Sequence, residues 1–215
     1  VAKWARAVTS PHTLYESVVR AGEMAQRVPK GPIYLNVALE HMLHDWTPPA
    51  GSREVPAAPA VQPRQEDVAK VTELLLNAKS PVIVTETAGR DPKAFSALVE
   101  IADLLAIPVI NGRVNAYANF PTDHPLYQGM GNYKALDDAD LVLLVGGRAP
   151  WYPARRRPTS GKIVAINDNP LKGHMVYQTL HADLYLEGDT AEALKLISAA
   201  AKAAKIDSAA VNARR

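Results

Sequence analysis

The sequence predicts an α/β protein with a doubly wound, mostly parallel sheet. From Gln65 onward, short apolar runs alternate with stretches of helical periodicity, the rhythm that builds such a sheet. The run 141–145 is apolar at every position and is bounded by Asp140 and by Gly146-Gly147. Strands of this composition are usually buried on both faces, as parallel sheets require.

The alternation sets the expected elements of a Rossmann-like domain over residues 65–205. Apolar side chains at helical spacing predict three helices, and β-rich runs predict five strands. The helices are expected near 65–78, 91–105 and 190–204, and the strands at 81–85, 107–110, 141–145, 163–166 and 182–186. The alanine-rich, basic residues 206–215 are expected to be a frayed tail.

Residues 1–46 form a separate block. Ser10-Pro11 is a favourable helix start, and an apolar stripe continues to Val28; a strand is expected at 33–37. One helix and one strand cannot make a core, so this block must pack on the rest of the chain or on another domain. The chain opens with Val1 inside such an element, which suggests a piece cut from a longer protein. Residues 47–64, crowded with proline and alanine, are expected to be an interdomain linker.

Composition excludes several classes of function. A net charge of +2 gives no reason to expect nucleic acid or an acidic membrane as a partner. No apolar run reaches the roughly 20 residues that span a bilayer. Cysteine is absent, which removes disulfides and thiolate chemistry and fits a cytoplasmic protein.

Three segments that follow strands could bind a ligand, because parallel sheets bind ligands beyond the carboxyl ends of their strands. Residues 87–90 could cradle a phosphate or form a turn, although Glu86 would repel a phosphate unless it points away. The same two interpretations, a phosphate-binding segment or a simple turn, apply to Gly146, Gly147 and Arg148. Asn167-Asp168 could accept hydrogen bonds from a ribose or form a turn before Pro170.

The basic run Arg155–Arg157 is expected in a loop, as a solvated surface or as a contact for a phosphate or an acidic partner. The six histidines are scattered, and no carboxylate pair or nucleophile motif stands out. The residues therefore nominate no catalytic group and no metal ligand.

The order of several motifs resembles thiamine-diphosphate-dependent enzymes, namely acetolactate synthase large subunits and benzoylformate decarboxylase-like enzymes. Lys3-Trp4 and the later GPIYL resemble the end of the family's pyrimidine-binding domain, and AKSPVIV resembles the opening of its central domain. DHPL with GMG, ADLVLLVG, KIVAIN and LEGD follow in the family's order. The resemblance covers nearly the whole chain.

The resemblance implies a parent enzyme that uses thiamine diphosphate and Mg²⁺ to break or form bonds beside a carbonyl group. The cofactor is held by pyrimidine- and pyrophosphate-binding domains, which become the expected partners in a homodimer or homotetramer. This segment is expected to be noncatalytic and to bind no thiamine diphosphate by itself.

In parts of this family the central domain carries FAD or ADP. The matching positions here are Thr87, Ala88, Gly89, Arg90, Gly129, Met130, Gly131, Gly146, Gly147, Arg148, Asn167 and Asp168. The sequence departs from the acetolactate synthase pattern at 85–89 and at 149–151. Two alternatives remain: a free-standing nucleotide-binding domain, or an interaction module that uses the basic loop. The 2-oxo acid substrate is not encoded in this segment.

Overall fold

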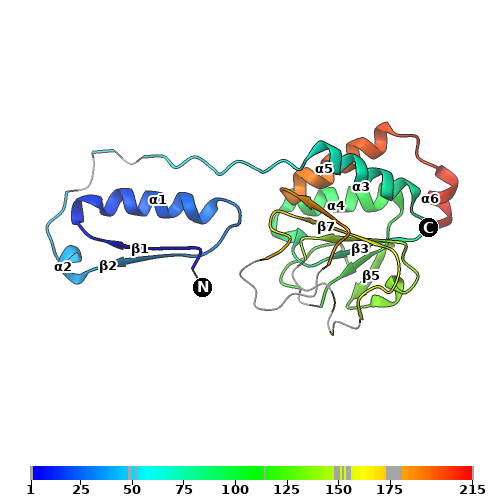
Figure 1. Cartoon of the computed structure of the whole chain (residues 1–215), viewed down its shortest axis with the longest axis horizontal. Helices are drawn as coiled ribbons and strands as arrows, with labels where there is room; N and C mark the ends of the chain where they lie inside the picture. The colour runs from blue at the N-terminus through cyan, green and yellow to red at the C-terminus, as the bar shows by residue number, and fades with distance from the viewer. Residues whose placement is uncertain are drawn as a thin grey trace. The chain divides into compact units, whose positions relative to one another are not determined.

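The computed structural model describes residues 2–47, 50–51, 53–113, 115–147, 151, 153, 156–172 and 181–214. The chain divides into two compact units, Val1–Pro59 and Ala60–Arg215. Figure 1 shows the first unit in blue and the second in green to red. In the described part of the chain, no helix is long and apolar enough to cross a bilayer.

The first unit contains a parallel pair of strands covered by one helix (Figure 1). Its elements are β1 (Trp4–Val8), the 3₁₀ helix η1 (Pro11–Thr13), α1 (Leu14–Gln26), β2 (Ile33–Val37) and α2 (Leu39–Met42). Ser10 caps η1 by accepting a hydrogen bond from the backbone N–H of His12. The sequence predicts α1 and β2 but neither β1 nor α2.

The second unit is a six-stranded, all-parallel sheet in the order β5-β4-β3-β6-β7-β8, which confirms the predicted fold class. Its strands are β3 (Pro81–Thr85), β4 (Val109–Asn111), β5 (Tyr127–Met130), β6 (Leu141–Val145), β7 (Lys162–Asn167) and β8 (Leu184–Glu187). Its helices are α3 (Gln65–Asn77), α4 (Pro92–Leu105), α5 (Thr190–Ala203) and α6 (Ser208–Arg214), with 3₁₀ helices η2 (Ala88–Arg90) and η3 (Tyr133–Leu136).

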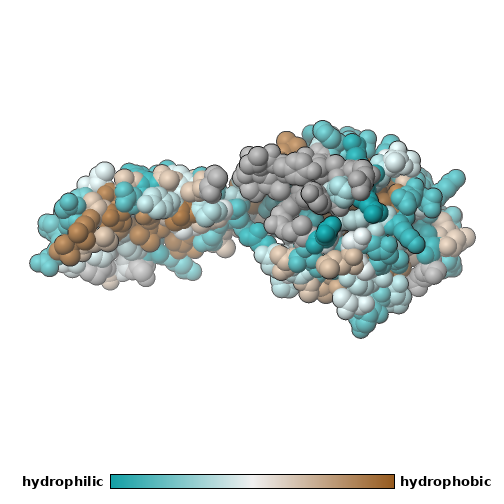
Figure 2. Space-filling model, turned by 90° about the horizontal axis from the view of Figure 1, so that it is seen from below, coloured by the Kyte–Doolittle hydropathy of each residue, from teal (hydrophilic) through white to brown (hydrophobic). Residues whose placement is uncertain are grey.

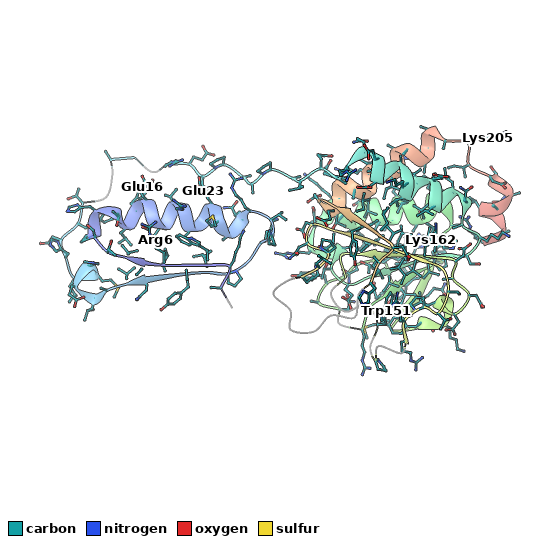
Figure 3. All side chains as sticks on the ribbon, in the orientation of Figure 1. Arg6, Glu16, Glu23, Trp151, Lys162 and Lys205 are labelled. Carbon is teal, nitrogen blue, oxygen red and sulfur yellow. The ribbon has the colours of Figure 1, made fainter. Side chains whose placement is uncertain are left out.

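Two cores lie on opposite faces of this sheet. On one face, Ile83, Leu143 and Ile166 pack against α3, α4 and α5. On the other face, Val82, Val84, Val142 and Leu144 pack with residues of η3 and with Trp151, which is fully buried. Figure 3 labels Trp151 on the side of the sheet away from the three helices. Every residue of β3 and β6 is buried, as expected for central strands of a parallel sheet.

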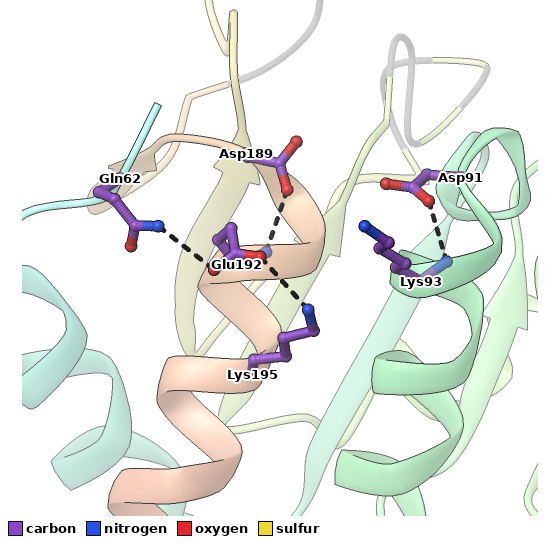
Figure 4. Close-up of polar contacts among 6 residues, drawn as sticks. All are labelled: Gln62, Asp91, Lys93, Asp189, Glu192 and Lys195. Carbon is purple, nitrogen blue, oxygen red and sulfur yellow. Dashed lines mark hydrogen bonds and ion pairs between the residues drawn. The ribbon is translucent and has the colours of Figure 1, made fainter. Parts of the chain in front are cut away.

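The end of the predicted linker belongs to the second unit. The backbone N–H of Asp189 donates to the carbonyl oxygen of Val61 over 2.8 Å, and Gln62 Nε2 donates to Glu192 over 3.2 Å (Figure 4). A Cβ on Gly188 would lie 2.8 Å from the nitrogen of Pro63. Residues 61–63 are therefore fixed at the start of α5.

The predicted frayed tail is wrong over most of its length. Residues 208–214 form α6, and the guanidinium of Arg214 donates to the carbonyl oxygens of Leu105 and Ala78. These acceptors lie at the carboxyl ends of α4 and α3. Long-range capping, which no local pattern reveals, holds this end of the chain in place.

Candidate functional site

The candidate site is the carboxyl edge of the sheet around β3, where the chain order reverses. After β3, the chain adds β4 beside it and β5 beside β4. It then crosses back, and β6 lies on the other side of β3. The switch point therefore lies between β3 and β6, where ligands of doubly wound sheets bind. Thr87, which follows β3, and Gly146, which follows β6, meet here: the Thr87 hydroxyl donates to the Gly146 carbonyl oxygen.

Glu86 lies at this switch point and is fully buried. Strand alternation places its side chain on the same face as Val82 and Val84, toward the core that contains Trp151. Two glycines lie beside it. A Cβ on Gly112 would lie 2.3 Å from Glu86 Cγ, and a Cβ on Gly147 would lie 3.7 Å from Glu86 Oε2. Only glycine at 112 leaves space for the Glu86 side chain.

Tyr133 is the titratable neighbour of this carboxylate. Its side chain is 8% exposed within the core that also contains Trp151. Burial raises the pKa of the Tyr133 phenol, and the negative charge of Glu86 adds to the rise. Arg113 and Arg156 act in the opposite direction on the same pKa. A buried carboxylate and two exposed arginines thus act on the pKa of the Tyr133 phenol at this edge.

The turn after β3 uses its own backbone donors. The N–H of Gly89 donates to Asn119 Oδ1 over 2.9 Å, that of Arg90 to the Thr87 carbonyl over 3.1 Å, and that of Asp91 to the Ala88 carbonyl over 3.2 Å. Gly89 itself is needed for packing, because a Cβ there would lie 1.8 Å from the carbonyl oxygen of Ala118.

The first turn of α4 is capped in the same way. Pro92 has no N–H, and the N–H of Lys93 donates to the Asp91 carboxylate over 2.9 Å (Figure 4). At the start of α5, Asp189 accepts from the N–H of Glu192 over 3.0 Å. Chain carboxylates therefore stand where a phosphate would meet either helix.

The remaining predicted positions lie farther along the same edge. Met130, 64% exposed, ends β5 between Gly129 and Gly131, which have positive φ angles of 93° and 66°. The N–H of Gly131 donates to the Asn111 carbonyl over 2.8 Å, so these residues close the sheet beside β4.

Asn167 is the last residue of β7, two strands from β3, and Asp168 follows it. Asn167 is buried and its Oδ1 accepts from the N–H of Asn169 over 2.9 Å, which is a turn. Asp168 is exposed. Arg148 and Arg155 lie outside the described residues, while Arg156 and Arg157 are exposed.

Sequence reasoning noticed Glu86 but missed the burial of its side chain, and it missed Asn119. Asn119 is fully buried, and it joins the turn after β3 to the segment after β4. One signal was available for Glu86: Gly112 directly follows the neighbouring strand β4, and a glycine there leaves room for the side chain that follows β3.

The residues at the switch point do not fit the phosphates of FAD or ADP. The switch point contains a buried carboxylate, and the amides of Gly89, Arg90 and Asp91 in the first strand–helix turn already have acceptors within the chain. Among the described residues, no three His, Asp or Glu side chains come together as a metal site.

Comparison with known proteins gives consistent results. A model of the thiamine pyrophosphate enzyme central domain matches residues 68–197. The acetolactate synthase large subunit of Mycobacterium tuberculosis is 30% identical over 150 residues, which cover 68% of this chain and 27% of that protein.

Two solved structures have the same fold. One, from Mycobacterium smegmatis and provisionally assigned as a thiamin diphosphate-dependent enzyme, is 26% identical with a TM-score of 0.76, over 96% of this chain and 40% of that one. Benzoylformate decarboxylase from Polynucleobacter necessarius is 20% identical with a TM-score of 0.78, over 92% of this chain and 38% of that one. This chain thus spans well under half of each of these proteins.

The family match covers more than half of the chain, and it spans the six-stranded sheet from α3 into α5. The chain therefore belongs to the thiamine pyrophosphate enzyme family, whose central domain its second unit represents.

Proposed function

We propose that this chain is a scaffold segment of a larger thiamine-diphosphate-dependent decarboxylase or carboligase. Its second unit would be the central domain, and its first unit the closing part of the pyrimidine-binding domain. The central domain would hold the two cofactor-binding domains in position without contributing a catalytic group.

The observation that carries this proposal is the incomplete core of the first unit. Within its described residues, only Val8, Ser17 and Ala21 are buried. Parallel strands are normally covered on both faces, whereas here α1 packs on one face. Large apolar side chains remain in contact with water: Val18, Tyr34, Leu39, Met42 and Leu43 are 54–76% exposed. Figure 2 shows a band of brown, hydrophobic side chains along this unit.

An exposed apolar surface of this kind marks a place where another polypeptide packs. The proposed cover is the remainder of the pyrimidine-binding domain. Its apolar strands would extend the β1–β2 pair and bury the outer face, including Tyr34, which is 59% exposed.

Charged residues of the first unit line a hollow of about 380 Å³. Arg6 in β1 and Glu16 and Glu23 in α1 contribute to it (Figure 3). Arg53 lies 3.8 Å from Glu16 and 3.9 Å from Glu23. Both carboxylates of the hollow thus lie close to Arg53 of the same unit, so we assign the hollow to packing of the same domain and not to a substrate.

The proposed parent enzyme uses thiamine diphosphate with Mg²⁺, acts on a 2-oxo acid or a related acyl compound, and works in the cytoplasm as a homodimer or homotetramer. The cofactor supplies an electron sink for the carbanion formed beside the carbonyl group. The residues of this chain contribute the spacing between the two domains that would bind it.

Calorimetric titration of the chain with Mg²⁺–thiamine diphosphate tests the scaffold role. We expect no binding to this chain, and thiamine-diphosphate-dependent decarboxylation of 2-oxo acids by the full-length protein that contains it. Tight binding of the cofactor to this chain would contradict the scaffold role. A full-length protein with no thiamine-diphosphate-dependent activity on 2-oxo acids or related acyl compounds would contradict the assignment of the parent.

A free-standing nucleotide-binding domain is the second candidate function. Its ligand would lie at the switch point where Thr87 and Gly146 meet, but the buried carboxylate of Glu86 there disfavours a phosphate. Binding of FAD or ADP by the chain would support it.

A further inference from the structure

We propose that Glu86 is an internal anion that closes the nucleotide crevice of this central domain. Its carboxylate would stand in the place of a ligand phosphate at the switch point between β3 and β6. The native chain then excludes ADP and FAD, and removal of this one carboxylate opens the crevice to them. The inference concerns the crevice alone and does not depend on which reaction the parent enzyme catalyses.

The first argument is the volume that Glu86 occupies. The side chain is fully buried, directly beyond the last residue of β3, in the position that a ligand would need. Gly112 and Gly147, which could have brought backbone close to a ligand, instead face the Glu86 side chain. Gly112 thus leaves room for a side chain of the protein itself, and Gly147 lies at ordinary contact distance from it.

The second argument is charge. A nucleotide phosphate placed beside a buried carboxylate would meet a like charge in a medium of low dielectric constant, where repulsion is much stronger than in water. The same carboxylate helps to raise the pKa of Tyr133, so its charge acts on a neighbouring side chain at this edge of the sheet.

The third argument is the supply of hydrogen-bond donors. Phosphates bind helix N-termini through free backbone N–H groups. Here Gly89, Arg90, Asp91 and Lys93 all donate to acceptors of the chain, and Pro92 has no N–H. A phosphate would have to displace Asn119 to accept from the N–H of Gly89, and the Asp91 carboxylate to accept from the N–H of Lys93.

The local charge without Glu86 would favour an anion. Arg113 and Arg156 both act on the pKa of Tyr133 from its surroundings, and both side chains reach solvent. In the native chain, the negative charge of the Glu86 carboxylate offsets the positive charges of these two arginines. Its loss would leave two cations and an empty volume between glycines, which is a suitable site for a phosphate.

The test is isothermal titration calorimetry of the intact chain with ADP, and then with FAD. The wild-type chain is expected to bind ADP no more tightly than about 1 mM. Glu86→Ala is expected to bind ADP at least about tenfold more tightly, because both the charge and the volume are removed. Glu86→Gln retains the volume and loses the charge, so its affinity is expected to lie between the two.

Glu187→Ala is the matched control. Glu187 ends β8 at the same edge of the sheet and is exposed, so its loss changes the net charge equally without opening the crevice. It is expected to behave as wild type. Circular dichroism establishes that each variant is folded.

Two outcomes would overturn the proposal: ADP or FAD binding to the wild-type chain as tight as to Glu86→Ala, or a folded Glu86→Ala no tighter than wild type. If Glu86→Ala does not fold, Glu86→Gln decides, and equality with wild type then counts against the proposal. Neither result bears on thiamine diphosphate binding, which tests the proposed function separately.

Discussion

The guanidinium of Arg214 donates a hydrogen bond of 3.0 Å to the carbonyl oxygen of Leu105, the last residue of α4. It also donates to the carbonyl oxygen of Ala78, the C-cap of α3. One cation near the chain end therefore serves two helix C-termini, where unpaired carbonyl oxygens favour positive charge. Burial lowers the pKa of Arg214, while Asp140 and Asp207 oppose the shift.

Arg214→Ala is expected to lower the free energy of unfolding of the second unit by about 1–2 kcal/mol, because two helix ends lose their partner. Lys205→Ala is the control: Lys205 is exposed on the segment just before α6 and carries the same charge (Figure 3). Urea unfolding followed by circular dichroism gives both values. Equal stability of the two variants would show that the contact contributes nothing.

Asp140 joins the starts of two neighbouring strands. Its carboxylate accepts from the N–H of Lys79 over 2.6 Å and from that of Ser80 over 2.9 Å, just before β3. Asp140→Ala is expected to lower the free energy of unfolding by about 1–2 kcal/mol, since two bonds to a charged acceptor are lost. Asp138→Ala, at an exposed position two residues earlier, should change it by less than about 0.5 kcal/mol. Denaturant unfolding of both variants checks this.

Gly89→Ala is expected to lower the free energy of unfolding by about 1–3 kcal/mol, because the new methyl group would meet the Ala118 carbonyl oxygen at 1.8 Å. Gly147→Ala, in the same crevice, has its nearest neighbour at 3.7 Å and should be nearly neutral. Thermal unfolding of the two variants side by side checks the difference. Tolerance of alanine at both positions would contradict the tight packing of the turn after β3.

Tyr133 should make stability depend on pH in alkaline solution. Burial raises the pKa of this phenol in the folded state above its unfolded value of about 10. The contribution of the neutral Tyr133 phenol to the free energy of unfolding is therefore fully present below about pH 10. It is lost as the pH rises through the folded-state pKa. Tyr133→Phe should remove this loss. Urea unfolding on either side of about pH 10 measures it for both proteins.

The same titration links Tyr133 to Glu86. Because the charge of Glu86 raises the pKa of Tyr133, Glu86→Gln should lower that pKa. Ultraviolet difference titration of the folded proteins measures tyrosine ionisation directly. An unchanged titration in Glu86→Gln would contradict the proximity of the two groups.

The central strands could be predicted from sequence because burial on both faces requires an unbroken run of apolar residues. All five residues of β6 are apolar, and all five are buried between the two cores. The strand predicted at 107–110 instead begins at Val109. Ile107 closes the C-terminus of α4, because its N–H donates to the Ala102 carbonyl over 2.9 Å.

The missed features depend on contacts between distant residues. The helix α6 is held by Arg214, which reaches residues more than 100 positions earlier in the chain. The burial of Glu86 depends on a glycine across the neighbouring strand, at position 112. The strand β5 contributes YQGM, a run with too little apolar character to predict a strand.

The contacts that hold residues 61–63 at the start of α5 determine where a protease can cut the chain. Proteases cut extended segments that fit into their active sites, and the described residues from 53 to 60 have neither helix nor strand. A cut is therefore expected upstream of Val61, whose carbonyl oxygen is bonded to Asp189. Limited digestion should leave a resistant fragment that begins close to residue 60, with the six-stranded sheet intact.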